Sequence, residues 1–371
     1  MTHPMLAQAN HDEQAEQLFV RDLKQYLTAE VEPLQRGIAE ALDPGPGHNA
    51  RAEHVYAALH HVPAFRSWAG VRRASQELLW QSVWDTVERQ APSLDGLAQA
   101  APALGSLSLD PHFTVPDYLE DAHVHLMPGG YSLDADGVRQ GAVMDRGGAV
   151  YMLGRNGGFM NDGRGQTVLG HLAACYPDLV PARLLELGCG IGASIVPVAR
   201  AFPDAESVAI DVGSSMLRYA HARAAHLGVA VDFVQADAEA TGFADESFDL
   251  VFSAALLHET SAEAITRIMA ECHRLLRKGG VVVHLEVPSR YAQLDLWTQV
   301  RAEVEHDYNN EPAWRAATSA DYAALLTAAG FVDCRIGFQD AVRNGDLAAS
   351  HFGPESKGTF LSWFVASARK V

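Results

Sequence analysis

Hydrophobic and polar positions follow two different spacings along the chain. Between residues 11 and 89, apolar side chains recur at helical intervals, which predicts helices at about 11–42, 51–61 and 67–89. Beyond about residue 166, short apolar runs alternate with helical patterns, as they do when helices connect the strands of a parallel sheet. Together these patterns predict an α/β fold with a mainly helical N-terminal module.

Changes in composition divide the chain into three predicted parts. Residues 1–125 would form a helical cap or dimerisation module, and a helical layer with no role beyond packing is the alternative. Residues 126–165 would form a loop-rich connector over a cofactor site, and residues 166–371 a catalytic domain. The loop-rich stretch contains three histidines, but no acid or cysteine lies at metal-ligand spacing from them on a clearly predicted helix or strand. We therefore interpret these histidines as loop residues rather than metal ligands. They are His112, His123 and His125.

A glycine loop follows the first apolar run of the predicted sheet. Gly188, Gly190 and Gly192 stand at alternate positions after the run at 184–187, where the backbone must turn tightly or approach a ligand closely. The helix that follows would point its free N–H groups at a ligand on this turn. The spacing also fits a dinucleotide such as NAD. Asp211, at the end of the next run, supplies a carboxylate that can bind both ribose hydroxyls.

Five motifs between residues 186 and 280 resemble, in their order along the chain, those of the class I S-adenosylmethionine-dependent methyltransferases. Their layout is closest to that of small-molecule O-methyltransferases. The resemblance covers roughly residues 150–371 and favours S-adenosylmethionine over NAD. It implies a Rossmann-like sheet of seven mostly parallel strands with helices on both faces, in which a last strand at 358–368 lies antiparallel between its neighbours. The motifs are 186–192, Asp211 with 214–217, Asp237-Ala238, 248–251 and 276–280.

The resemblance also implies which residues bind S-adenosyl-L-methionine and its product S-adenosyl-L-homocysteine. Asp211 would bind the ribose, and Asp237 with Ala238 would contact the adenine. Tyr151 and Arg155, in the glycine-rich connector, would contact the carboxylate and the methionine tail, with an ordinary flexible connector as the alternative. The predicted cofactor-binding residues are Tyr151, Arg155, Glu186, Gly188, Gly190, Asp211, Met216, Asp237, Ala238 and Ser253.

Two residues at neighbouring strand ends are the predicted catalytic pair. His258 follows the fourth strand and Glu286 ends the fifth, so both are expected at the edge of the sheet where ligands bind. A hydroxyl acceptor needs a base, and histidine suits this role at neutral pH. The pair is similar to the His-Asp and glutamate set of the plant and acetylserotonin O-methyltransferases, although Glu259 and Thr260 replace their aspartate and tryptophan. We therefore predict His258 as general base and Glu286 as its orienting acid; a packing role for His258 is the alternative.

A polar stretch at 305–312 lies between the fifth and sixth predicted strands, where this fold usually closes over the acceptor. It predicts a polar wall for a small-molecule substrate, with a solvated charged loop as the alternative. The predicted substrate-binding residues are Glu259, His306, Asn309 and Asn310.

Three other functions are kept as alternatives. His258, Glu259 and His306 have the residue types of a metal site, which would fit metal-assisted C-methylation of an α-keto acid. Methylation at sulfur or nitrogen is a second alternative, and a cofactor-binding regulatory protein without activity is a third. The favoured interpretation, O-methylation of a small molecule, includes no metal.

Composition limits the partners. The formal net charge is −18, which argues against nucleic acid and against anionic membranes as partners. The four cysteines are scattered, which suggests reduced thiols rather than a disulfide framework or zinc site. We see no signal peptide and no apolar run of membrane-spanning length, so we expect a cytoplasmic enzyme, with a homodimer through the helical module as a further expectation.

Overall fold

The computed structural model describes residues 2–48, 51–120, 123–131, 137–152, 154–287, 294–342, 345–358 and 360–371, and every structural statement below refers to these residues. Residues 132–136 and 153 of the predicted connector lie outside them. None of the described helices combines the length and the hydrophobicity that crossing a bilayer requires.

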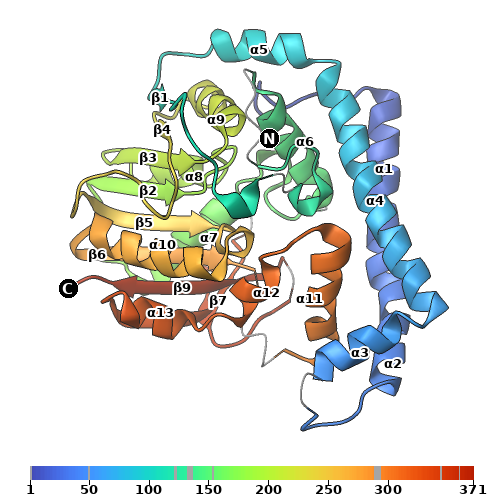
Figure 1. Cartoon of the computed structure of the whole chain (residues 1–371). Helices are drawn as coiled ribbons and strands as arrows, with labels where there is room; N and C mark the ends of the chain where they lie inside the picture. The colour runs from blue at the N-terminus through green and yellow to red at the C-terminus, as the bar shows by residue number, and fades with distance from the viewer. Residues whose placement is uncertain are drawn as a thin grey trace.

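A mixed sheet of nine described strands lies at the centre of the fold, in the order β1-β4-β3-β2-β5-β6-β9-β7-β8 (Figure 1). Neighbours from β1 to β6 are parallel, and β9 is antiparallel to both β6 and β7. The predicted Rossmann-like sheet and its antiparallel last strand are therefore confirmed. The count exceeds seven because the short edge strands β1 and β8 pair with β4 and β7. The strands are β1 (Ser106–Ser108), β2 (Arg183–Leu187), β3 (Glu206–Asp211), β4 (Asp232–Gln235), β5 (Phe248–Ala254), β6 (Leu276–Glu286), β7 (Val332–Asp340), β8 (Phe352–Gly353) and β9 (Ser362–Arg369).

Helices cover both faces of the sheet, which explains why its central strands are apolar on both sides. One core contains Val168, Ile195 and Leu217 from the first group of helices, and the other contains Ile265 and Leu326 from the second. The first group is α7 (Gly163–Cys175), α8 (Ile195–Ala201) and α9 (Ser214–His226); the second is α10 (Ala262–Leu275) and α13 (Tyr322–Ala328).

Most of the remaining helices pack on one another beyond the sheet, and some also contact α9 or α10. Figure 1 shows α1 and α4 side by side along one edge of the molecule, and α11 packs against α4. Trp68 of α4 and Trp297 of α11 share one apolar core there. These helices are α1 (His11–Tyr26), α2 (Glu32–Ala41), α3 (Arg51–Leu59), α4 (Pro63–Glu88), α5 (Ala91–Gln99), α6 (Arg139–Tyr151), α11 (Leu296–Asn309) and α12 (Trp314–Ser319), with a π-helical turn η1 (Leu27–Val31) between α1 and α2.

The structure of residues 1–125 differs from the sequence-based expectation at one place. β1 falls inside this stretch, yet it extends the sheet beside β4. The three-part division itself stays a prediction.

Candidate active site

A cavity lies where the carboxyl ends of β2, β3 and β5 meet, the edge at which open α/β sheets bind ligands. The glycine loop after β2, Asp211 of β3 and the turn after β5 line it from the sheet. Tyr151 of α6 and His125 of the short 3₁₀ turn η3 (Val124–Leu126) line it from outside the sheet. The cavity therefore combines sheet motifs with side chains from the N-terminal half of the chain.

Two glycines of the loop have different physical roles. Gly188 and Gly190 both have positive φ, +62° and +50°, which favours glycine. A Cβ on Gly188 would lie 2.5 Å from Cδ1 of Leu256, so this glycine lets the turn after β5 pack closely. A Cβ on Gly190 would meet no atom within 4 Å. The backbone at Gly190, which lines the cavity, is therefore open to a ligand.

Backbone amides of two loops orient Asp211. The N–H of Gly190 donates to Oδ2 at 2.8 Å, and the N–H of Gly213 donates to Oδ1 at 2.9 Å. Burial raises the pKa of Asp211, and these amide hydrogen bonds oppose the rise. Each carboxylate oxygen can accept a further hydrogen bond. The carboxylate is thus fixed in place and still able to accept two hydroxyls.

Glu186 and Arg164 have buried polar atoms without partners. Oε2 of Glu186 and Nε of Arg164 make no hydrogen bond to the described residues, and both side chains line the cavity. Burial raises the pKa of Glu186 well above its usual value, although the nearby Arg164 opposes this. Burial lowers the pKa of Arg164. Unpaired buried groups of opposite charge suit a zwitterionic ligand that carries an ammonium and a carboxylate.

The other predicted cofactor residues divide into two groups. Tyr151, Asp237 and Ala238 line the cavity together with Glu186, Gly188, Gly190 and Asp211. The structure does not bring the rest to its described lining. Arg155 is exposed, Met216 is buried in the core between α6 and α9, and Ser253 bonds to His284 at 2.8 Å. Sequence reasoning missed Arg164, which lies on α7 just before the first motif and has no spacing signal of its own.

His258 and Glu286 form a buried pair. Nδ1 of His258 lies 2.8 Å from Oε2 of Glu286, and the other oxygen of Glu286 accepts the N–H groups of Leu256 and Leu257 at 2.8 and 2.5 Å. Nε2 of His258 faces Glu259, 3.3 Å from its Oε1. Burial alone would lower the pKa of His258, but the carboxylates of Glu286 and Glu259 outweigh it and raise the pKa to about 10. In this state the imidazole is held as a cation between two carboxylates.

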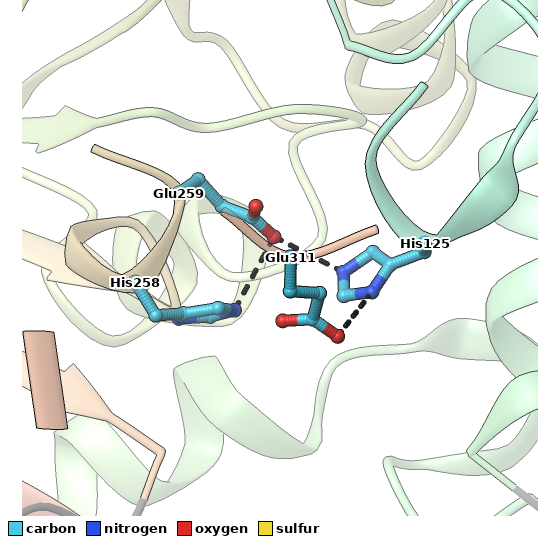
Figure 2. Close-up of side chains that lie close together, drawn as sticks. All are labelled: His125, His258, Glu259 and Glu311. Carbon is cyan, nitrogen blue, oxygen red and sulfur yellow. Dashed lines mark ion pairs between the residues drawn. The ribbon is translucent and has the colours of Figure 1, made fainter. Parts of the chain in front are cut away.

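His258 is also one of four side chains that converge, as Figure 2 shows: His125, His258, Glu259 and Glu311. We call them the four-residue cluster. Oε1 of Glu259 lies 3.0 Å from Nε2 of His125 and 3.3 Å from Nε2 of His258. Nδ1 of His125 lies 2.8 Å from Oε1 of Glu311. His125 lies in a short turn of the loop-rich stretch, as predicted, but the inference that no acid stands near it is wrong, because its side chain is held between two carboxylates.

The helical region positions His125. Its carbonyl oxygen accepts Nε2 of Gln76 at 2.9 Å and Nε1 of Trp80 at 2.7 Å, both from α4. The residue has φ +57°, and Leu126 after it has φ +59°. Such a backbone costs free energy in non-glycine residues and persists only where the surroundings impose it. Contacts from α4, distant in sequence, thus place this imidazole in the cavity.

Only part of the predicted substrate set reaches the cluster. Asn309 donates to Oε1 of Glu311 at 2.6 Å, whereas Asn310 donates to the backbone oxygen of His123 at 2.9 Å. His306 is half-exposed and pairs with Asp307 at 2.8 Å, outside the cluster. The set of His258, Glu259 and His306 is therefore not brought together; His125 and Glu311 stand beside His258 and Glu259 instead. Glu311 belonged to the polar stretch, but no spacing singled it out.

Comparisons with known proteins agree with the motifs of the sheet. Residues 184–280 match a family described as a methyltransferase domain. A malonyl-[acyl-carrier protein] O-methyltransferase of Methylococcus capsulatus is 41% identical over 103 residues, which cover 27% of this chain and 35% of the relative. A fatty-acid O-methyltransferase of Mycolicibacterium smegmatis is 30% identical over 136 residues, which cover 36% of this chain and 47% of the relative.

The chain spans less than half the length of these two curated relatives. Among solved structures, a methyltransferase of Thermotoga maritima, described as a possible histamine N-methyltransferase, matches 62% of this chain and 98% of its own, with a TM-score of 0.43 and 20% identity.

Proposed function

This chain contains a class I S-adenosylmethionine-dependent methyltransferase domain, and on this premise we propose that the protein transfers a methyl group to an oxygen atom of a small molecule. The observation that carries the proposal is the shared cavity. One part is lined by the glycine loop, Asp211 and Asp237, and the other by His258 and Glu259. A methyl donor and an acceptor can therefore meet in one cavity.

The residues of the first part fit S-adenosylmethionine, which supplies an electrophilic methyl group when bound. Asp211 would accept the two ribose hydroxyls, and Asp237 with Ala238 would lie against the adenine. The unpartnered Oε2 of Glu186 would accept the ammonium, and Arg164 would bind the carboxylate, so that both buried groups gain partners. Arg164 thus takes the role that the sequence predicted for Arg155.

An oxygen acceptor is supported by the chemistry of the second part and by the relatives. Two relatives are O-methyltransferases by name. The second part of the cavity offers imidazole and carboxylate groups, which can hydrogen-bond a hydroxyl or a carboxylic acid and take up its proton.

His258 is the residue that we expect to contact the acceptor oxygen, and Glu286 is its positioning residue. The bond from Nδ1 to Glu286 leaves Nε2 directed at Glu259 and the cavity. An acceptor that takes the place of Glu259 beside Nε2 would remove one of the two carboxylates that keep the imidazole protonated. The neutral imidazole would then accept the proton of the acceptor, as the predicted general base requires.

In this proposal the N-terminal helices, together with α11, act as a cap. Through Gln76 and Trp80, α4 fixes the turn that carries His125, and α11 leads into Glu311. His125 lines the acceptor part of the cavity and Glu311 contacts His125, so these helices would complete the site rather than only pack against the sheet.

The test is product identification with the purified chain. S-adenosylmethionine carrying an isotopically labelled methyl group is incubated with fractionated small-molecule extracts, and labelled products are identified by mass spectrometry. Treatment with mild alkali then separates methyl esters, which hydrolyse, from ethers, which do not. We expect a product labelled at oxygen. Products labelled only at carbon, sulfur or nitrogen would contradict the O-methylation proposal, and a chain that binds no S-adenosylmethionine in calorimetry would contradict the cofactor assignment.

A further inference from the structure

We propose that His125, His258, Glu259 and Glu311 bind a divalent first-row transition-metal ion in the acceptor part of the cavity. One ligand atom from each of the four side chains lies within 4.8 Å of the others. The residues come from three places in the chain: His125 from η3, His258 and Glu259 from the turn after β5, and Glu311 from the segment after α11. Their convergence is therefore a product of the tertiary fold rather than of one charged loop.

The arrangement around Glu259 resembles a ligand shell that surrounds a shared point. Its Oε1 lies within hydrogen-bonding distance of Nε2 of His125, and 3.3 Å from both Nε2 of His258 and the hydroxyl of Tyr131. Nε2 of His125 and Nε2 of His258 both face Oε1 of Glu259, so both nitrogens also face the space next to that oxygen. An ion there would be neutralised by the two cluster carboxylates and bound by both imidazoles.

Glu311 gives an independent indication of a missing partner. Its side chain is 1% exposed, and while Oε1 is bonded to Asn309 and His125, Oε2 has no hydrogen-bond partner among the described residues. A buried carboxylate oxygen without a partner is costly. Coordination of a cation would remove this cost.

The supporting hydrogen bonds have the form found around bound metals. A ligating histidine usually donates its second ring N–H to a carboxylate, which fixes the tautomer and the ring orientation. Glu286 stands 2.8 Å from Nδ1 of His258 in that position. Two imidazoles with two carboxylates suit Fe²⁺, Zn²⁺, Co²⁺ or Mn²⁺, whereas Mg²⁺ and Ca²⁺ prefer all-oxygen sites.

The ion would deepen the proposed function, and this part of the inference rests on it. An acceptor hydroxyl bound to the ion loses its proton to water more readily. The acceptor oxygen then forms a bond to the methyl carbon of S-adenosylmethionine as the sulfur–carbon bond breaks. The electron pair of the broken sulfur–carbon bond stays on sulfur. With the ion bound, Nε2 of His258 is a ligand, and the ion rather than the imidazole promotes loss of the proton.

The test is direct metal binding by the whole chain without S-adenosylmethionine. Protein stripped with a chelator and dialysed is titrated with Co²⁺, whose visible absorption reports ligand number and type, and with Zn²⁺ in a calorimeter. We expect one ion per chain. Glu286→Gln should weaken binding about 10–100-fold, and Glu311→Gln and His125→Ala at least as much. Glu263→Gln and His112→Ala, at exposed positions, are the matched controls and should bind like the native chain.

Folding and function are separated from metal binding by two further measurements. Each variant should keep the native circular dichroism spectrum and the native affinity for S-adenosylmethionine. No Co²⁺ or Zn²⁺ binding, or equal binding by the native chain and a Glu311→Gln chain that folds, would overturn the inference. Full methyl transfer in the presence of chelator would refute the proposed role of the metal and leave the proposed function standing. Metal binding without any methylated product would refute the proposed function and leave the metal site standing.

Discussion

Nδ1 of His258 lies 2.8 Å from Oε2 of Glu286, although the two residues are 28 positions apart in the sequence. They meet because β5 and β6 are adjacent and parallel, so the turn after β5 lies beside the last residue of β6. Glu286 also accepts two backbone N–H groups of that turn. One carboxylate therefore fixes both the imidazole and the loop that carries it.

Removal of this imidazole should slow the reaction without weakening cofactor binding. We expect His258→Ala to lower kcat about 10²–10⁴-fold, because the imidazole acts on the acceptor in the transition state, either as the base or as a ligand of the proposed ion. Glu286→Gln should lower kcat less, since the imidazole remains. The affinity for S-adenosylmethionine, measured by calorimetry, should be unchanged in both. Normal turnover by His258→Ala would make this residue structural, and catalysis would then rest on proximity and orientation.

Asp211→Ala should weaken S-adenosylmethionine binding. The variant loses the carboxylate that would accept the ribose hydroxyls and leaves polar groups unpaired, at a cost of about 1–3 kcal/mol. Calorimetry gives the dissociation constant directly, and Asp204→Ala, at an exposed position before β3, is the matched control. An unchanged dissociation constant in Asp211→Ala would refute the ribose assignment.

Which arginine binds the carboxylate of S-adenosylmethionine, Arg164 or Arg155, can be tested with a related ligand that lacks the amino-acid group. Arg164→Gln should weaken binding of S-adenosylmethionine by about 1.5–3 kcal/mol, the range for hydrogen bonds to charged groups. It should leave binding of 5′-methylthioadenosine unchanged, because that molecule lacks the carboxylate. Arg155→Gln serves as the control and should affect neither ligand. Equal losses for both ligands in Arg164→Gln would indicate a general disturbance of the cavity instead of a carboxylate contact.

His171 should make the fold sensitive to acid. The side chain is buried on α7, with Nδ1 3.0 Å from Oε1 of Gln339 and Nε2 2.9 Å from Oγ of Ser367. Burial lowers its pKa from 6.5 to about 4, and the bond to Gln339 opposes this. The unfolded chain therefore binds the proton first. The stability that depends on neutral His171 is complete above pH 6.5 and is lost as the pH falls toward 4, by about 2 kcal/mol at pH 5.

Urea unfolding at pH 7.5 and pH 5.0 checks this linkage. The free energy of unfolding of the native chain should fall between the two pH values by about 2 kcal/mol more than that of His171→Gln, which has no proton to bind there. His112→Gln, at an exposed loop position, should behave like the native chain. Equal losses for native and His171→Gln proteins would show that other groups cause the acid sensitivity.

Local features of the sequence were sufficient to predict the sheet and several of the residues that line the cavity. The sequence pattern reveals features that depend only on neighbouring residues. These are apolar runs of strand length, glycines at tight turns and an acid at the end of a strand. Gly188, Gly190, Asp211 and Asp237 line the cavity as expected. Ser253 and Met216 were expected there for the same reason, yet they face the interior, because the position of a residue along a strand or helix does not decide which neighbour its side chain meets.

The acceptor side depended on contacts between distant segments. Along the chain, His125 is one of several histidines in a loop-rich stretch, and Glu311 is one acid in a polar run. The packing of α4 on η3, with Trp80 and Gln76 bonded to the His125 carbonyl, places His125 beside His258 and Glu259, and the end of α11 places Glu311 there. The sequence by itself determined the sheet and the glycine loop, because spacing and residue type encode local backbone geometry. The tertiary structure decided the four-residue cluster, because the distance between its members is set by helix packing and not by their separation in the chain.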